Sequence, residues 1–172
     1  MSIGPRAALA AVLLLTAAAA EAQERKSARI VANLGVIGVG SGSDSALTGS
    51  LEWRGSQPLF WQIAPLAGAL ATSDGAAYGY VGAYIDVPIK EKWYFTPSIA
   101  VGVYGEGSGK DLGHRVEFKP QAEISYRLTA SQHVGLSFYH LSNTGLADRN
   151  PGTNGLAATY SVSLSALSGL LP

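Results

Sequence analysis

Apolar and polar side chains alternate along much of the chain, which is the pattern of β-strands with one bulky face and one small or polar face. Over residues 133–143 the even positions Val134, Leu136 and Phe138 are bulky and apolar, whereas the odd positions are mostly small or polar. The same alternation occurs over residues 155–164. Good helix formers at helical spacing do not occur after the N-terminal segment, so the pattern predicts an all-β fold.

Clusters of Gly, Ser, Asp and Asn divide this pattern into expected strands. The segments are Ala28–Val39, Leu47–Ser56, Phe60–Ala71, Ala77–Ile89, Trp93–Gly105, Arg115–Leu128, His133–Asn143 and Gly155–Leu164. Long and short connections mostly alternate, and Ser73-Asp74-Gly75 forms a tight turn in place of a long loop. The long ones are 40–46, 106–114 and 144–154, and the short ones are 57–59, 90–92 and 129–132. This arrangement predicts an eight-stranded antiparallel outer-membrane β-barrel with its short turns in the periplasm.

The composition favours a lipid-facing barrel over a soluble one. The chain is 47% hydrophobic but only 14% charged, against about 25% charged in a soluble domain. A soluble sandwich or lipocalin-like barrel shows the same alternation with the bulky face turned inward, so alternation alone does not choose between them. Aromatic residues near the expected strand ends match the interfacial girdles of membrane barrels. They are Trp53, Trp61, Trp93, Tyr94 and Phe95.

Residues 1–22 have the features of a secretory signal peptide. Arg6 gives a positive start, an alanine-rich run follows, and Ala20-Glu21-Ala22 is an A-x-A cleavage site. The run is too short and too alanine-rich to be preferred as a membrane span. We therefore expect an exported protein whose residues 23–172 form a single β-barrel domain in the cell outer membrane.

Charge and cysteine content exclude several classes of function. The 12 basic residues balance 12 acidic residues, so the positive excess of nucleic-acid-binding proteins is missing and no nucleic-acid partner is expected. The chain has no cysteine, which excludes disulfides and a thiol nucleophile. Its 3 histidines lack ligand-like spacing, so the sequence predicts neither a metal site nor a cofactor.

Two polar residues share the bulky, lipid-facing side of residues 133–143. His140 and Ser142 follow the apolar even positions at the outer end of this expected strand. Residues i and i+2 of a strand lie on one face roughly 6.5–7 Å apart, so the imidazole can reach the hydroxyl. An ionisable residue facing lipid suggests a functional site, and a serine beside a histidine is the minimum for nucleophilic acyl transfer. The alternative is that both are polar residues tolerated at the headgroup level.

The residues around this pair carry a fairly specific motif, H-x-S-N-x-G at 140–145 followed by N-P-G at 150–152. This region resembles the PagL family of outer-membrane lipid A 3-O-deacylases, which are acyloxyacyl hydrolase-like enzymes. The resemblance extends from about Gly102 to Leu164, and in the N-terminal half only the export signal, the barrel pattern and the length agree. The upstream segments that contribute to it are 109–114, 117–118 and 123–128.

The resemblance implies an ester hydrolase whose site lies on the outer, lipid-facing surface of the barrel. It implies that Ser142 is the nucleophile, that His140 is the general base and that Asn143 helps to hold the oxyanion. The family places a glutamate at the start of the last strand to orient the histidine, but this chain has Asn154 there. Asparagine accepts a hydrogen bond from the ring N–H but carries no charge to stabilise the imidazolium.

Three interpretations of this substitution stay open: a slow Ser-His-Asn esterase, an enzyme that uses Asp148 from the loop, and a barrel that has lost activity. For an enzyme, the resemblance implies hydrolysis of the ester-linked 3-hydroxyacyl chain of lipid A, in lipopolysaccharide of the outer leaflet. Lipids of the outer membrane are the other expected partners, and the sequence leaves a homodimer open. The alternative function is a non-enzymatic outer-membrane barrel with a structural or adhesive role.

Charged residues are also expected inside the barrel. Glu117 and Glu123 share the odd face of the sixth expected strand. If that face lines the lumen, arginines such as Arg115 or Arg127 are the expected partners, in a structural role.

Overall fold

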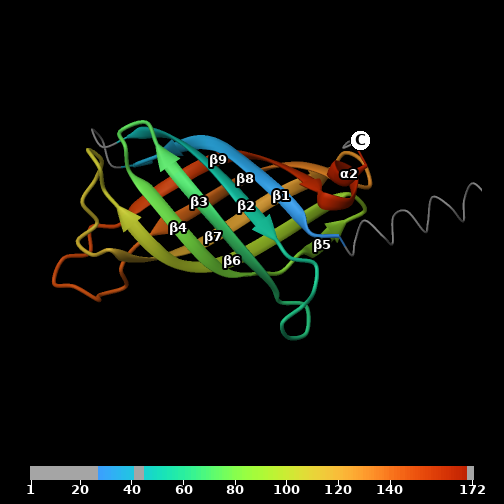
Figure 1. Cartoon of the computed structure of the whole chain (residues 1–172), viewed down its shortest axis with the longest axis horizontal. Coiled ribbons are helices and arrows are strands. Elements are labelled where there is room, and N and C mark those ends of the chain that lie inside the picture. The colour runs from blue at the N-terminus through green and yellow to red at the C-terminus, as the bar shows by residue number, and fades with distance from the viewer. Residues whose placement is uncertain (1–26, 41–44, 170–172) are drawn as a thin grey trace, which may run out of the picture.

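The computed structural model describes residues 27–40 and 45–169. The signal peptide expected over residues 1–22 lies outside the described residues and stays a prediction. Across the described ranges, no helix has the length and apolarity needed to cross a membrane. The strands of these ranges are long and tilted, and they enclose a barrel (Figure 1).

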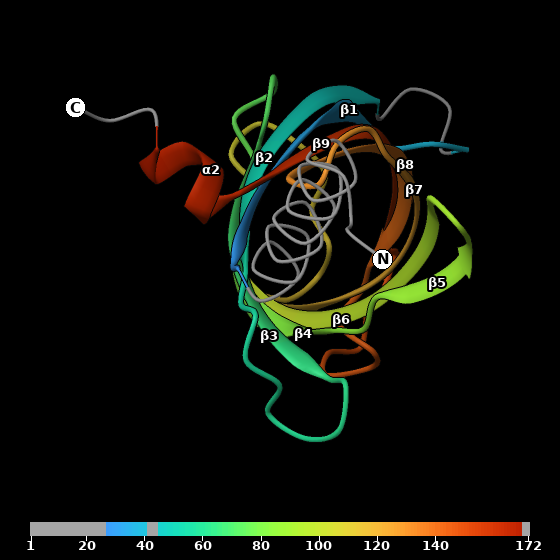
Figure 2. The same ribbon diagram turned by 90° about the vertical axis from the view of Figure 1, so that its right-hand side faces the viewer.

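Antiparallel strands form one closed sheet (Figures 1 and 2). They are β1 (Arg29–Ile37), β2 (Ala46–Arg54), β3 (Ala64–Thr72), β4 (Ala77–Tyr84), β5 (Val87–Lys90), β6 (Trp93–Gly105), β7 (Val116–Arg127), β8 (Gln132–Leu141) and β9 (Thr153–Ser163). Except for β4 and β5, neighbours in sequence pair with one another; β1 pairs with β9, and β4 closes the sheet on β6. Because β4 and β5 both pair with β6 and only Ile85 and Asp86 separate them, they act as one interrupted strand. The predicted eight-stranded antiparallel barrel is therefore confirmed.

Two segments differ from the strand boundaries expected from the sequence. The third strand begins at Ala64 rather than at Phe60, and residues 55–63 form a loop where a short turn was expected. Phe60, Trp61 and Ile63 have high β-propensity, which explains why the sequence predicts a strand there. After β9 the chain forms a short helix, α2 (Leu164–Ser168), whose N-cap Ser163 accepts a hydrogen bond from Ala166 N at 3.3 Å.

Side chains alternate between the outside and the inside of the barrel as predicted. On β8, Leu136 is 61% exposed on the outer face, whereas Tyr139 is 3% exposed and points inward. Phe138 and Leu156 of β9 extend the apolar outer face. An apolar outer face over a polar interior is the arrangement of outer-membrane barrels.

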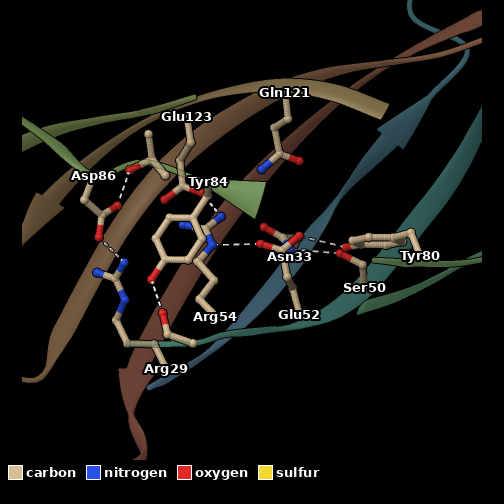
Figure 3. Close-up of polar contacts among 12 residues, drawn as sticks. Arg29, Asn33, Ser50, Glu52, Arg54, Tyr80, Tyr84, Asp86, Gln121 and Glu123 are labelled. Carbon is tan, nitrogen blue, oxygen red and sulfur yellow. Dashed lines mark hydrogen bonds and ion pairs between the residues drawn. The ribbon is translucent and has the colours of Figure 1, made fainter. Parts of the chain in front are cut away.

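The barrel interior contains an ion-pair network built around Arg54 (Figure 3). Arg54 donates to Glu52 Oε1 at 2.7 Å and to Glu123 Oε2 at 2.6 Å, and all three side chains are almost fully buried. Tyr80 donates to the second oxygen of Glu52 at 3.0 Å. Glu123 therefore pairs with a lumen arginine as expected, but that arginine is Arg54 on β2, across the lumen, and not one of the two named from the sequence.

Glu117 also differs from expectation. Its side chain is fully buried, and neither carboxylate oxygen has a hydrogen-bond partner in the described part of the chain. The sequence places Glu117 in the lumen correctly, but the expected pairing with Arg115 or Arg127 is not formed within the described residues.

Candidate active site

His140 and Asn154 face each other across two neighbouring strands, at the end of the barrel opposite α2. They are direct partners in the register of β8 and β9. Both lie on the outer face, because their even parity is that of Phe138 and Leu156. His140 Nδ1 and Asn154 Oδ1 are 2.8 Å apart, a distance typical of a direct hydrogen bond.

Contacts with the first loop fix the position of Asn154. The backbone N–H groups of Gly38 and Val39 donate to the backbone oxygen of Asn154 at 2.8 and 3.1 Å. The side-chain nitrogen of Asn154 donates to the Val39 oxygen at 3.4 Å. A flipped amide would place two carbonyl oxygens against each other at Val39, so this contact favours the orientation in which Oδ1 faces His140. In that orientation Nδ1 of His140 carries the proton and Nε2 is an acceptor.

Gly152 allows the chain to pass directly beside the His140 ring. Its φ of 57° lies in the left-handed region that favours glycine. A Cβ atom at this position would lie 2.9 Å from Cε1 and 3.1 Å from Nε2 of His140. The glycine of the N-P-G sequence is therefore needed both for the backbone conformation and for the space that the imidazole occupies.

Ser142 follows β8 directly and is held by the neighbouring strand. Its backbone exchanges two hydrogen bonds with Phe118 of β7, at 2.8 and 3.1 Å. Its residue exposure is 9%. No hydrogen bond joins the Ser142 hydroxyl to His140 within the described ranges. The two side chains thus come from one strand end, without a base–nucleophile hydrogen bond between them.

Asn143 connects two loops at this end of the barrel. It is fully buried, and its side-chain nitrogen donates to the backbone oxygens of Leu112 at 3.0 Å and of Arg149 at 2.8 Å. Its side-chain oxygen accepts from the Gly145 N–H at 3.0 Å. Both amide hydrogens are thus engaged with backbone carbonyls, and contact with an oxyanion requires one of these bonds to open.

The segment after Asn143 forms a tight turn. Thr144 and Gly145 have φ angles of 53° and 87°, and the Leu146 N–H donates to the Asn143 oxygen at 3.1 Å. Positive φ at both central residues is the geometry of a type I′ turn. The turn brings the chain back so that Asn150 accepts from the Asn143 N–H at 3.0 Å.

Asp148 lies in this loop and is not hydrogen-bonded to the imidazole in the described part of the chain. Its side chain is exposed. The Nδ1 atom of His140 is instead bonded to Asn154. No cluster of three or more His, Asp or Glu side chains suited to a metal ion occurs in the described ranges.

The sequence did not indicate two residues that shape this site. Val39 was expected to end a strand, and only the barrel closure brings its carbonyl to Asn154. Asn150 was noted as part of the N-P-G sequence, but its hydrogen bond with Asn143 N was not expected. Asn150 precedes a proline, and such asparagines favour turns, which is the signal available in the sequence.

Comparison with known proteins identifies the family of this chain. The profile of the family described as "Lipid A 3-O-deacylase (PagL)" matches residues 47–163. Lipid A deacylase PagL of Bordetella bronchiseptica is 31% identical over 72 residues, which cover 41% of this chain and 40% of that protein. This match therefore spans less than half the length of the curated relative.

Solved structures share the barrel fold. The structure of the outer membrane enzyme PagL has a TM-score of 0.63 with 20% identity, covering 79% of this chain and 99% of that chain. Neisserial surface protein A has a TM-score of 0.52 with 12% identity, covering 80% of this chain and 96% of that chain. At these identities the two structures show a common architecture only.

Proposed function

Because the chain belongs to the lipid A 3-O-deacylase (PagL) family, we propose that it hydrolyses the ester-linked 3-hydroxyacyl chain of lipid A in the outer leaflet. As a member of that family it is an outer-membrane β-barrel. Its longer loops and the His140–Asn154 pair then lie at the extracellular end, and α2 lies at the periplasmic end.

The observation that carries the proposal is the hydrogen-bonded pair His140–Asn154 on an otherwise apolar, lipid-facing wall. Phe138 and Leu156 lie next to the pair along β8 and β9, so acyl chains of a lipid in the outer leaflet can pack against them. An ester at the headgroup level of such a lipid would lie beside His140 and Ser142. A substrate dissolved in water would not reach a site on this face, because lipid surrounds it.

In the proposed reaction, Ser142 Oγ attacks the ester carbonyl carbon while His140 Nε2 takes the hydroxyl proton. The tetrahedral intermediate expels the sugar oxygen, which takes the proton back from His140. Water then attacks the acyl-enzyme with the same base and releases the fatty acid and free Ser142. The role of Asn154 is to keep the proton on Nδ1, so that Nε2 is free to act as base.

An asparagine in this role supports slower catalysis than the glutamate of the family. It fixes the tautomer, but it adds no negative charge beside the imidazolium that forms in the transition state. In the serine-protease example, an Asp-to-Asn change in this role reduces kcat by about 10⁴ because the histidine takes the wrong tautomer. Here the Asn154 oxygen lies 2.8 Å from Nδ1, so the missing charge is the part of that effect expected to slow the reaction. We therefore propose a slow Ser-His-Asn esterase, and the contact between Asn154 and His140 favours it over a mechanism that uses Asp148.

The oxyanion role of Asn143 stays a prediction. Because its amide hydrogens bond the Leu112 and Arg149 carbonyls, its first contribution is to hold the Ser142 loop in place. A catalytic contribution would follow only if substrate binding opens one of these hydrogen bonds.

The direct test is to incubate the purified, detergent-solubilised barrel with lipid A and to measure the product by mass spectrometry. We expect loss of one 3-hydroxyacyl chain, and we expect Ser142→Ala and His140→Ala to abolish it. Absence of release from the wild type, or equal release from Ser142→Ala, would contradict the proposal and leave the non-enzymatic barrel as the function.

A further inference from the structure

The loop between β2 and β3 is the exception among the connections at the periplasmic end. This β2–β3 loop (residues 55–63) is long, whereas residues 91–92 and 128–131 make the other two connections at that end. It is folded on itself, because the Leu59 N–H donates to the Ile63 oxygen at 2.8 Å and the Ile63 N–H donates to the Phe60 oxygen at 2.9 Å. Trp61 has a φ of 50° at the turn.

The tip of this loop is apolar and exposed. Leu59, Phe60 and Trp61 are 69%, 76% and 71% exposed. Residues 55–63 contain no Asp, Glu, Lys or Arg, whereas the neighbouring periplasmic turn consists of Glu91 and Lys92. Three consecutive large apolar side chains in an uncharged loop are unusual on a surface that faces water.

The direction of the loop places this tip beside the barrel. Figures 1 and 2 both show the β2–β3 loop projecting sideways from the wall, and in Figure 1 it hangs below the barrel near the α2 end. A loop that continued along the barrel axis would enter the periplasm. A loop that turns outward from the wall of a membrane barrel instead meets the leaflet that surrounds that end.

We propose that the β2–β3 loop is a lateral anchor that inserts Leu59, Phe60 and Trp61 into the phospholipid of the inner leaflet of the outer membrane. The loop continues the lipid-facing surface, since exposed Trp53 lies on β2 just before it. Only part of its backbone is hydrogen-bonded internally, so it belongs at the interface rather than in the hydrocarbon core. Aromatic side chains are favoured at this depth.

Two other occupants would produce a similar surface. A second copy of this chain or a periplasmic protein would also cover an apolar tip. The lateral direction and the continuity with Trp53 favour lipid over a periplasmic protein. Lipid and a second copy are separated by the experiment.

The test uses the fact that the chain has only three tryptophans. A Trp53→Phe, Trp93→Phe variant leaves Trp61 as the only tryptophan. It is reconstituted into vesicles of phosphatidylcholine brominated at shallow or deep acyl positions, and tryptophan fluorescence is excited selectively. We expect strong quenching of Trp61 that is greater for the shallow bromines, at every lipid-to-protein ratio. The matched control keeps Trp93 as the only tryptophan and adds Leu59→Ser and Phe60→Ser. Leu59→Ser and Phe60→Ser should reduce the quenching of Trp61 in the Trp61-only variant. In the Trp93-only variant the same two changes should leave the quenching of Trp93 unchanged.

Absence of quenching by brominated lipid, with quenching by aqueous iodide, would overturn the proposal. Quenching that appears only at high lipid-to-protein ratios would mean that a second copy covers the loop tip until dilution separates the two copies. That result would also overturn the proposal. If the tryptophan variants fail to fold, the wild-type barrel labelled with 5-fluorotryptophan gives the same answer. Its Trp61 ¹⁹F resonance should broaden with a spin-labelled lipid.

Discussion

The side-chain oxygen of Asn154 lies 2.8 Å from Nδ1 of His140, directly across the β8–β9 ladder. This contact gives the histidine an acceptor for its ring N–H but no charge. Asn154 is itself bonded to the Val39 carbonyl, so the first loop, the last strand and the histidine form one chain of hydrogen bonds. Asn154 thus supplies a hydrogen-bond acceptor at the position where the resemblance implies a glutamate.

Restoring a charge at this position should raise activity. Asn154→Asp keeps an oxygen at Nδ1 and adds a negative charge next to the imidazolium, so we expect kcat/KM for lipid A to rise about tenfold, which corresponds to about 1.4 kcal/mol of transition-state stabilisation. The carboxylate loses the bond to the Val39 oxygen, so the free energy of unfolding should fall by about 1–3 kcal/mol.

Two variants serve as controls for this prediction. Asn154→Leu has a similar volume but no acceptor, and it should abolish turnover. Asp148→Asn should leave turnover unchanged. If Asp148→Asn abolishes turnover while Asn154→Asp has no effect, the acid comes from the loop and the role of Asn154 is wrong.

The tautomer of His140 can be observed directly. Because Asn154 Oδ1 accepts from the ring, His140 should be protonated at Nδ1 when it is neutral. With histidine labelled by ¹⁵N, long-range ¹H–¹⁵N correlation spectra of the barrel in detergent distinguish the two tautomers, and variants of His114 and His133 assign the signals. We expect Asn154→Leu to shift His140 toward the Nε2–H form, and an unchanged pattern in that variant would exclude this positioning role.

The all-β fold and the face of each polar residue could be predicted from the sequence, because strand side chains alternate with a period of two. That period placed His140 and Tyr139 on opposite faces, and the low charge content assigned the His140 face to the outside, as the structure has it. The β2–β3 loop could not be predicted, since its apolar residues have the composition of a strand. Local composition does not report whether a segment finds a partner strand.

Contacts across the barrel could not be predicted for a different reason. Arg54 and Glu123 are 69 residues apart in sequence and lie on β2 and β7, which are not neighbours in the sheet. Their contact depends on which interior positions face each other after closure. The Val39–Asn154 contact is similar, because it exists only when β1 pairs with β9.

Gly152 should be needed for activity in a way that other loop glycines are not. In Gly152→Ala the new Cβ would lie within 3.1 Å of two atoms of the His140 ring, so the ring must move. A displacement of this kind should lower kcat by about 10- to 100-fold. Gly145→Ala is the matched control, because Gly145 also has positive φ but has open space at its Cβ position.

Both glycine variants should lose about 1–2 kcal/mol of stability from backbone strain. Only Gly152→Ala should also lose activity when both proteins are assayed folded. An equal loss of activity in the two variants would mean that the loop conformation matters and that the space beside His140 does not.

Arg54 and Arg149 both form ion pairs, but their contributions to stability should differ strongly. Arg54 is buried between Glu52 and Glu123, so Arg54→Leu removes the ion-pair partner of Glu123 and leaves Glu52 with Lys119, which is 3.9 Å away. This loss should cost about 3–5 kcal/mol. Arg149 pairs with Asp111 at 3.0 Å, but their side chains are 70% and 53% exposed. Arg149→Leu should therefore cost no more than about 1 kcal/mol.

Urea unfolding of the barrel in phospholipid vesicles, followed by tryptophan fluorescence, measures both free energies. The double change Arg54→Leu, Glu123→Gln should recover much of the loss, because it removes the unpaired carboxylate together with the arginine and keeps Glu52 beside Lys119. Failure of the double variant to recover stability would show that Arg54 acts mainly by filling the lumen and packing on the Tyr84 ring, which lies 5.4 Å from its guanidinium carbon. Equal losses from Arg54→Leu and Arg149→Leu would contradict the prediction, since burial would then make no difference to the two pairs.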